Sequence, residues 1–216
     1  MPFDKDYDRL IAIAEVAETR PAWRGYAKYC GLRGQGLRPA AMAALDAFIN
    51  DSDNWPFEAR LEFIQWVLTE GRAFGDNAAL IPQPLHARLA VPTVVEWSAR
   101  SPNDARAHLW LGLLGLDAPL DHLKRALELD PTCEMARKTL FEWSLDDVDY
   151  NQHHMPDFYI HDPRPDLVDL DLIEGIVRGS TAISWVDERM AEINALRTIA
   201  LEWLAAHPTD GDFATS

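Results

Sequence analysis

Apolar residues recur along most of the chain at the three- and four-residue spacing of an amphipathic helix. One such face runs through residues 57–68, and another through residues 186–204. The nearest approach to the two-residue alternation of a β-strand is at 91–95, where Pro92 interrupts it. The pattern therefore predicts an all-α protein.

Prolines divide this pattern into segments, because proline suits the first turn of a helix and breaks its interior. The predicted helices cover residues 4–18, 21–31, 38–50, 56–70, 84–90, 92–100, 102–116, 119–129, 131–146, 167–178 and 184–206. Ser101 and Ser184 are the expected N-caps of two of them. Residues 150–166 are predicted to form an irregular loop, and 208–216 a flexible tail.

The middle of the chain contains an internal repeat. Residues 101–116 align without gaps on residues 130–145, at an offset of 29 residues. The two copies share the pairs Pro102/Pro131, Ala107/Ala136, Leu111/Leu140 and Leu116/Leu145. A repeated helical unit that cannot bury its apolar face alone must stack on a neighbour.

Within 101–145 the chain resembles the tetratricopeptide-repeat family. Leu111-Gly112 matches the family's Leu-Gly pair, and Ala126 and Pro131 match the close of its second helix. The copies are closer together than the usual period of about 34 residues, and Phe141 replaces the glycine in the second copy. The resemblance implies degenerate stacked helical hairpins in an α-α superhelix. We expect one helical domain over 1–207, with a repeat core at about 56–146 and C-terminal helices at 167–206.

The resemblance also implies a binding groove lined by the first helix of each repeat. Matched position by position, the groove residues are Arg106, Leu109 and Leu113 from one copy and Met135, Lys138 and Glu142 from the next. Family members use such grooves to hold a peptide or the surface of a partner protein.

Charge narrows the choice of partner. The 216 residues include 35 acids and 20 bases, for a formal net charge of −15. Such a chain repels nucleic-acid phosphates and anionic membranes, whereas a basic protein partner would match it. Its only cysteines are Cys30 and Cys133, and they suggest neither a disulfide framework nor a zinc site. The acidic N-terminus does not resemble a signal peptide, so a cytoplasmic location is expected.

The sharpest charge asymmetry lies at 141–175, which holds ten acids and a single base, Arg164. This stretch is either a solvated face or a docking patch for a basic partner. The residues predicted to contact a partner there are Asp146, Asp147, Asp149, His153, His154, Tyr159 and His161.

The same stretch offers an alternative chemistry. Imidazole and carboxylate groups suit zinc, iron or manganese, and the candidate ligands are His153, His154, Asp157, His161 and Asp162. Adjacent histidines tend to point apart in a regular backbone, and the spacing matches no familiar metal motif. These histidines could instead form local hydrogen bonds that hold the loop.

Three functions remain open at this point. The favoured one is a non-enzymatic protein-interaction module without a cofactor, such as an inhibitor or immunity protein for a basic toxin, an adaptor, or a specialised chaperone. The alternatives are a metal-dependent enzyme built on the histidine loop and a structural subunit of a larger assembly. The sequence leaves the oligomeric state undetermined.

Overall fold

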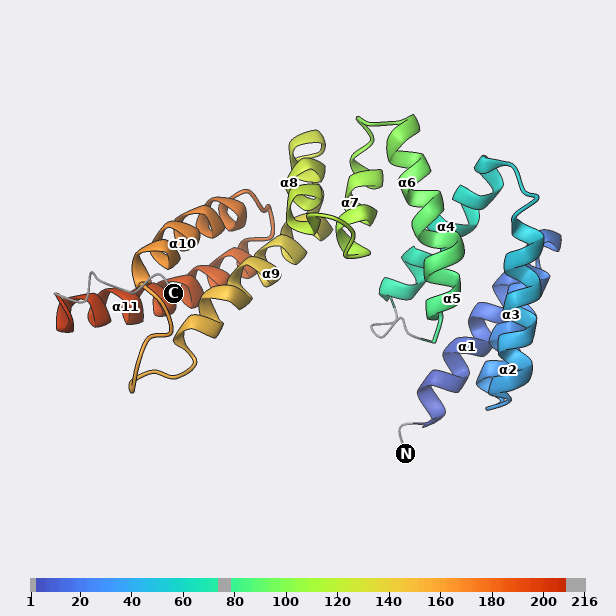
Figure 1. Cartoon of the computed structure of the whole chain (residues 1–216), viewed down its shortest axis with the longest axis horizontal. Coiled ribbons are helices and arrows are strands. Elements are labelled where there is room, and N and C mark those ends of the chain that lie inside the picture. The colour runs from blue at the N-terminus through green and yellow to red at the C-terminus, as the bar shows by residue number, and fades with distance from the viewer. Residues whose placement is uncertain (1–2, 74–78, 209–216) are drawn as a thin grey trace. The chain divides into compact units, whose positions relative to one another are not determined.

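The computed structural model describes residues 3–73 and 79–208, and every regular element within them is a helix. The predicted all-α fold is confirmed, and within each part of the chain several pairs of consecutive helices pack as hairpins (Figure 1). The chain divides into two compact units, Met1–Pro102 and Asn103–Ser216, which we call the N-terminal and C-terminal units. No helix in the described ranges has both the length and the apolar character needed to cross a bilayer.

In the N-terminal unit α1 packs on α2 and α2 on α3, while α4 packs on the helical segment that ends in α6. The elements are α1 (Phe3–Glu18), η1 (Pro21–Trp23), α2 (Arg24–Gly34), α3 (Arg38–Ser52), α4 (Phe57–Ala73), α5 (Gln83–Leu85), η2 (His86–Ala90) and α6 (Val91–Arg100). The core is rich in aromatic contacts: Tyr26 and Phe63, for example, meet edge to face with ring centroids 5.1 Å apart. Cys30 lies in this core, where burial raises the pKa of its thiol to about 12.

The predicted helices 84–90 and 92–100 form one helical path from α5 through η2 to α6. The backbone stays helical at Ala90 and Val91, and the Val91 N–H bonds to the His86 carbonyl five residues back. Pro92 has no N–H to donate, so a wider π-type turn just before it lets the helix continue. The expected break at this proline is therefore wrong.

In the C-terminal unit each helix from α7 to α11 packs on the next one along the chain. The helices are α7 (Ala105–Leu113), α8 (Pro119–Leu129), α9 (Glu134–Gln152), α10 (Pro163–Arg178) and α11 (Ile183–Ala206). One core, around Leu123 and Ala126, joins α7, α8 and the start of α9. A second core, around Leu170 and Ile193, joins the rest of α9 to α10 and α11.

Gly112 sets how closely α7 approaches α8. A Cβ atom at this position would lie 2.7 Å from Leu123 Cγ and 3.0 Å from the Pro119 carbonyl oxygen, so only glycine fits without a shift. Ala126, on the facing helix, is fully buried. The two residues that suggested a repeat therefore lie at tight contacts in a helical hairpin, while membership of the tetratricopeptide family stays a prediction.

Several predicted boundaries move. The irregular loop expected at 150–166 is shorter, because α9 continues to Gln152 and α10 already begins at Pro163. Asp104, not Ser101, caps α7 by accepting a hydrogen bond from the Arg106 N–H. Ser184 lies inside α11 instead of capping it.

The division into two units falls after residue 102, inside the repeat core expected at 56–146. The chain forms two compact units, while the single domain expected over 1–207 stays a prediction. Most of the tail predicted at 208–216 lies outside the described residues.

Candidate functional site

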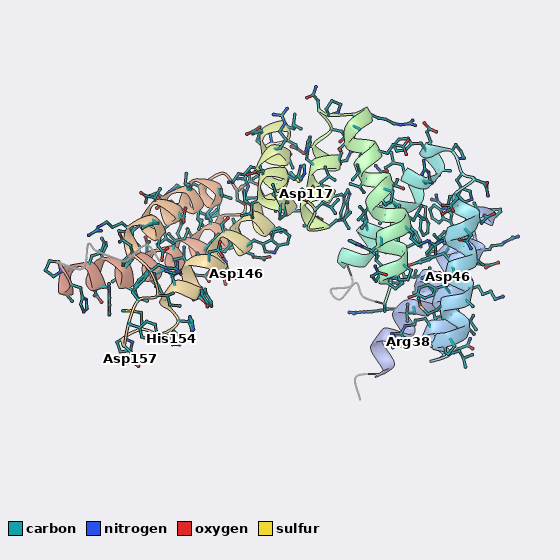
Figure 2. All side chains as sticks on the ribbon, viewed as in Figure 1. Arg38, Asp46, Asp117, Asp146, His154 and Asp157 are labelled. Carbon is teal, nitrogen blue, oxygen red and sulfur yellow. The ribbon has the colours of Figure 1, made fainter. Side chains whose placement is uncertain are left out.

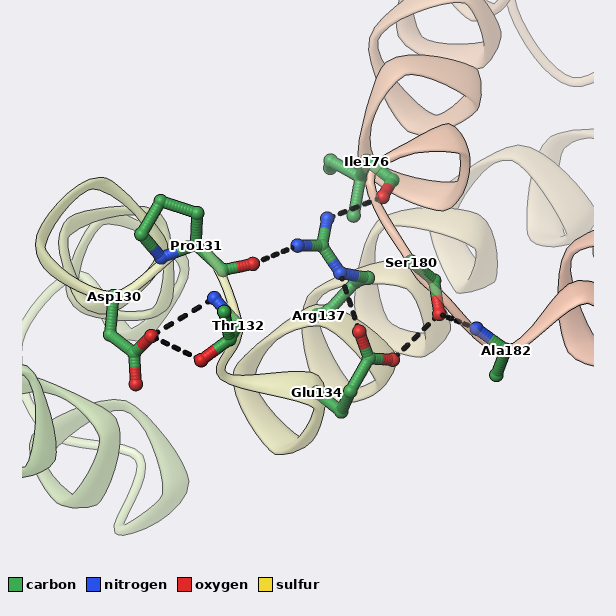
Figure 3. A network of polar contacts seen from close by, with 8 residues as sticks. All are labelled: Asp130, Pro131, Thr132, Glu134, Arg137, Ile176, Ser180 and Ala182. Carbon is green, nitrogen blue, oxygen red and sulfur yellow. Dashed lines mark hydrogen bonds and ion pairs between the residues drawn. The ribbon is translucent and has the colours of Figure 1, made fainter.

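α9 carries most of the residues singled out by the sequence, and a buried arginine fixes its start. Arg137 is 5% exposed, and its guanidinium donates hydrogen bonds to the Pro131 carbonyl, to the Ile176 carbonyl at 2.8 Å and to Glu134 Oε1 at 3.3 Å (Figure 3). The other Glu134 oxygen accepts a hydrogen bond from the Ser180 hydroxyl at 2.7 Å. These bonds tie the turn before α9 to the C-terminal end of α10, where a cation is also favoured by the helix dipole.

One face of α9 collects residues that the sequence assigned to two separate surfaces. Met135, Lys138, Glu142, Asp146 and Asp149 follow one another at steps of three and four residues, so they share one side of the helix. All of them are exposed. At the helical rise of 1.5 Å per residue this surface is about 21 Å long. We call it the α9 face.

The acids of 141–175 fall into two groups in the structure. On α10, Asp171 and Glu174 both accept from Arg197, at 2.8 and 2.9 Å. Asp162 caps the start of α10 and pairs with Arg164. Among the described residues of 141–175, six carboxylates have neither an ion pair nor a capping role and are exposed: Glu142, Asp146, Asp147 and Asp149 on α9, Asp157 in the loop after it, and Asp169 on α10. Negative charge is therefore left uncompensated along α9.

Exposed aromatic rings contact one another in a row at the C-terminal end of α9 and in the following loop, the first two pairs tilted and the last stacked. The Tyr150 and His153 ring centroids are 5.0 Å apart, those of His153 and His154 3.8 Å, and those of His154 and Phe158 4.6 Å. Tyr150 is 62% exposed and Phe158 48%. We call these four residues the ring ladder.

The expectation that the adjacent histidines point apart is wrong. The helix ends at Gln152 and the chain turns at His153, whose Nδ1 donates to the Tyr150 carbonyl. This local bond turns the first imidazole onto its neighbours. Figure 2 labels His154 and Asp157 in this turn and Asp146 on the α9 face.

Tyr159 is buried, 4% exposed, and does not belong to the accessible surface for which it was predicted. Its hydroxyl donates to Asp166 Oδ2 at 2.6 Å and accepts from Gln152 Nε2 at 2.9 Å. Asn151 Nδ2 donates to the other Asp166 oxygen at 2.9 Å. Burial raises the pKa of Asp166, while these hydrogen bonds lower it. The network fastens the loop to α9 and α10.

The predicted groove residues of α7 are only partly accessible. Leu109 is buried in the core between α7 and α8, and Leu113 packs against the same core. Arg106 is exposed and pairs with Asp104 at 2.8 Å. Of this half of the predicted groove, only Arg106 presents an exposed side chain.

The alternative metal set is not brought together. The His153 and His154 rings are in tilted contact with each other, Asp162 caps α10, and His161 lies on the surface beyond the buried Tyr159. Among the residues with described side chains, no group of three or more His, Cys, Asp and Glu is placed to hold a metal ion.

The sequence reading missed Arg137 and Asp166. Each stands where the helical pattern calls for an apolar residue: Arg137 is one turn before the buried Phe141, and Asp166 one turn before the buried Leu170. A charged residue at a position that the helical period assigns to the buried face was the available signal, because a buried charge needs hydrogen-bonding partners inside the fold.

Comparison with known protein families, with characterised proteins and with solved structures finds no match to this chain. What it does must therefore be argued from its own residues.

Proposed function

We propose that this protein is a non-enzymatic interaction module of the cytoplasm, and that it binds a basic protein partner through the α9 face. The observation that carries the proposal is the common side shared by Glu142, Asp146 and Asp149, which leads into the ring ladder and forms no ion pair with another described residue. An uncompensated acidic strip beside exposed rings suits a partner that brings positive charge and flat contact surface.

The perturbed ionisable groups support binding over catalysis. The Cys30 thiol is enclosed in the N-terminal core, and Tyr159 and Asp166 are bonded to each other in a network that holds the loop. Shifted pKa values at these positions follow from burial in the fold, and a reactive group in an open cleft is not needed to explain them.

The partner should be captured from the native cell with three baits in parallel: the natural protein, an α9 variant and a control. The α9 variant carries Asp146→Lys, Asp147→Lys and Asp149→Lys. The control carries Asp8→Lys, Glu15→Lys and Asp53→Lys, three exposed acids of the N-terminal unit. Both variants change the net charge equally, so only a localised site distinguishes them.

We expect the α9 variant to lose a partner that the control retains, with an unchanged thermal midpoint, because exposed charges contribute little to stability. Association measured by surface plasmon resonance should slow as salt rises, since screening shortens the range of steering, while dissociation changes less. His153→Ala and His154→Ala should act mainly on the dissociation rate. If both charge variants lose the partner equally, or if the association rate does not depend on salt, the acids of α9 only keep the surface hydrated and do not form a docking site.

A further inference from the structure

The ring ladder has two open ends. Tyr150 contacts His153 at one end and Phe158 stacks on His154 at the other, and within the described residues neither takes part in another ring contact. Both side chains are about half exposed or more, at 62% and 48%. Large aromatic side chains so exposed are unusual on a surface that needs only to be solvated.

Each open end has a carboxylate near it in the chain. Asp146 lies one helical turn before Tyr150, so the two side chains are neighbours on the α9 surface. Asp157 immediately precedes Phe158, and its backbone N–H bonds to the His154 carbonyl at 3.0 Å. Neither carboxylate has an ion pair among the described residues. A π-face and a carboxylate without an ion pair therefore share one side of α9 at the Tyr150 end, and at the Phe158 end they belong to consecutive residues.

We propose that the ring ladder binds arginine side chains of the basic partner, one guanidinium at each end. This rests on the proposed function and specifies the partner's chemistry. A guanidinium is planar and weakly hydrated, so it can stack on a ring while its edge donates two hydrogen bonds to a carboxylate. A lysine ammonium is a compact, strongly hydrated point charge, which gains less from the ring.

Other occupants fit these groups less well. An apolar helix would cover Asp146 and Asp157 without pairing them, at a desolvation cost. A second copy of this chain, with its formal net charge of −15, would bring like charges together. A quaternary ammonium group could sit on the rings but has no hydrogen to donate to the carboxylates.

The test compares hexa-arginine and hexa-lysine peptides, which carry equal side-chain charge, by fluorescence anisotropy at low salt. The ladder variant is Tyr150→Leu with Phe158→Leu, which removes two exposed π-faces and keeps apolar bulk. Leu172→Ala is the control, an exposed apolar residue of α10. The Asp146/Asp147/Asp149 charge-reversal variant and its N-terminal control are measured alongside.

We expect the natural protein to bind hexa-arginine about two- to five-fold more tightly than hexa-lysine for each guanidinium stacked on a ring. The ladder variant should lose this preference by weakening hexa-arginine binding alone, while Leu172→Ala keeps it.

The two proposals fail in different ways. Equal affinity for the two peptides, or a preference that survives in the ladder variant, overturns the arginine assignment. If hexa-lysine binding still falls in the α9 charge variant and not in its control, the acidic docking face stands without it. If neither peptide distinguishes the α9 charge variant from its control, both proposals fall.

Discussion

Replacing Arg137 by methionine should destabilise the C-terminal unit by about 3 kcal/mol. Methionine keeps the buried stem of the side chain but removes the guanidinium, and with it the bonds to Pro131, Ile176 and Glu134. Breaking a fully buried ion pair costs about 3–5 kcal/mol. We take the lower end, because the Glu134 side chain is 34% exposed and can turn to water. The Pro131 and Ile176 carbonyls also lose this donor, but Pro131 is exposed and Ile176 half-buried, so water can replace the guanidinium there and the total stays near about 3 kcal/mol.

Gly179 provides an independent check on the same guanidinium. A Cβ at Gly179 would lie 2.3 Å from Arg137 Nη1 and 3.0 Å from Cζ, atoms that methionine lacks. The backbone at Gly179 has φ −76°, which alanine adopts freely. Crowding by the new Cβ therefore decides whether Gly179→Ala stabilises or destabilises the protein. Gly179→Ala should cost about 1–3 kcal/mol in the natural protein. In the Arg137→Met background it should cost far less, giving a coupling above about 0.5 kcal/mol.

The measurement is native-state hydrogen exchange read by mass spectrometry, because the eight tryptophans are spread along the whole chain and fluorescence would mix signals. Protection should fall in α9 and α10 and stay unchanged in α2. Arg178→Met is the matched control: this side chain is 61% exposed and, among the described residues, pairs with Glu174 alone, so a loss of about 0.5 kcal/mol or less is expected. A loss below about 1 kcal/mol for Arg137→Met, or strictly additive effects with Gly179→Ala, would refute the reasoning.

Two further outcomes follow from α7 and α8 and can be measured by urea unfolding. Gly112→Ala should destabilise by about 1–3 kcal/mol, because its Cβ would meet Leu123, whereas Gly175→Ala, with open space around it, should stabilise by up to about 1 kcal/mol. Equal effects would contradict the close approach of the two helices. His122 Nδ1 lies 3.3 Å from His108 Nδ1. Burial, and after it the nearby His108, lower the pKa of His122, while Asp121 and Asp117 raise it by a smaller amount. The unfolded chain therefore binds the proton first, so stability should be fully present above about pH 6.5 and fall as the pH drops through the lowered pKa. His122→Gln should make stability depend less on pH in this range. Parallel stability–pH profiles for the natural protein and the variant would count against this role of His122.

Local patterns in the sequence were sufficient for most of the helices. The 3.6-residue period and the prolines place α8 at its observed bounds and most of the other helices within a few residues, because such signals act within one turn of the chain. They failed at Pro92, where the outcome depends on a π-type turn that neighbouring helices hold in place. They also stopped α9 too early, since Val148 and Gln152 are kept helical by burial against later parts of the chain.

The candidate site shows the same difference between what local sequence signals predict and what tertiary contacts decide. The sequence by itself determined the net charge, the acid-rich stretch and the helical spacing that sets Glu142, Asp146 and Asp149 on one side, all of which are properties of order along the chain. Only the tertiary structure decided which of these groups stay free. In that structure Leu109 and Tyr159 are buried, Asp171 and Glu174 pair with Arg197, and the His153 ring contacts that of His154. Burial and pairing depend on residues far away in the sequence, and no local pattern encodes which distant side chain will lie beside a given residue.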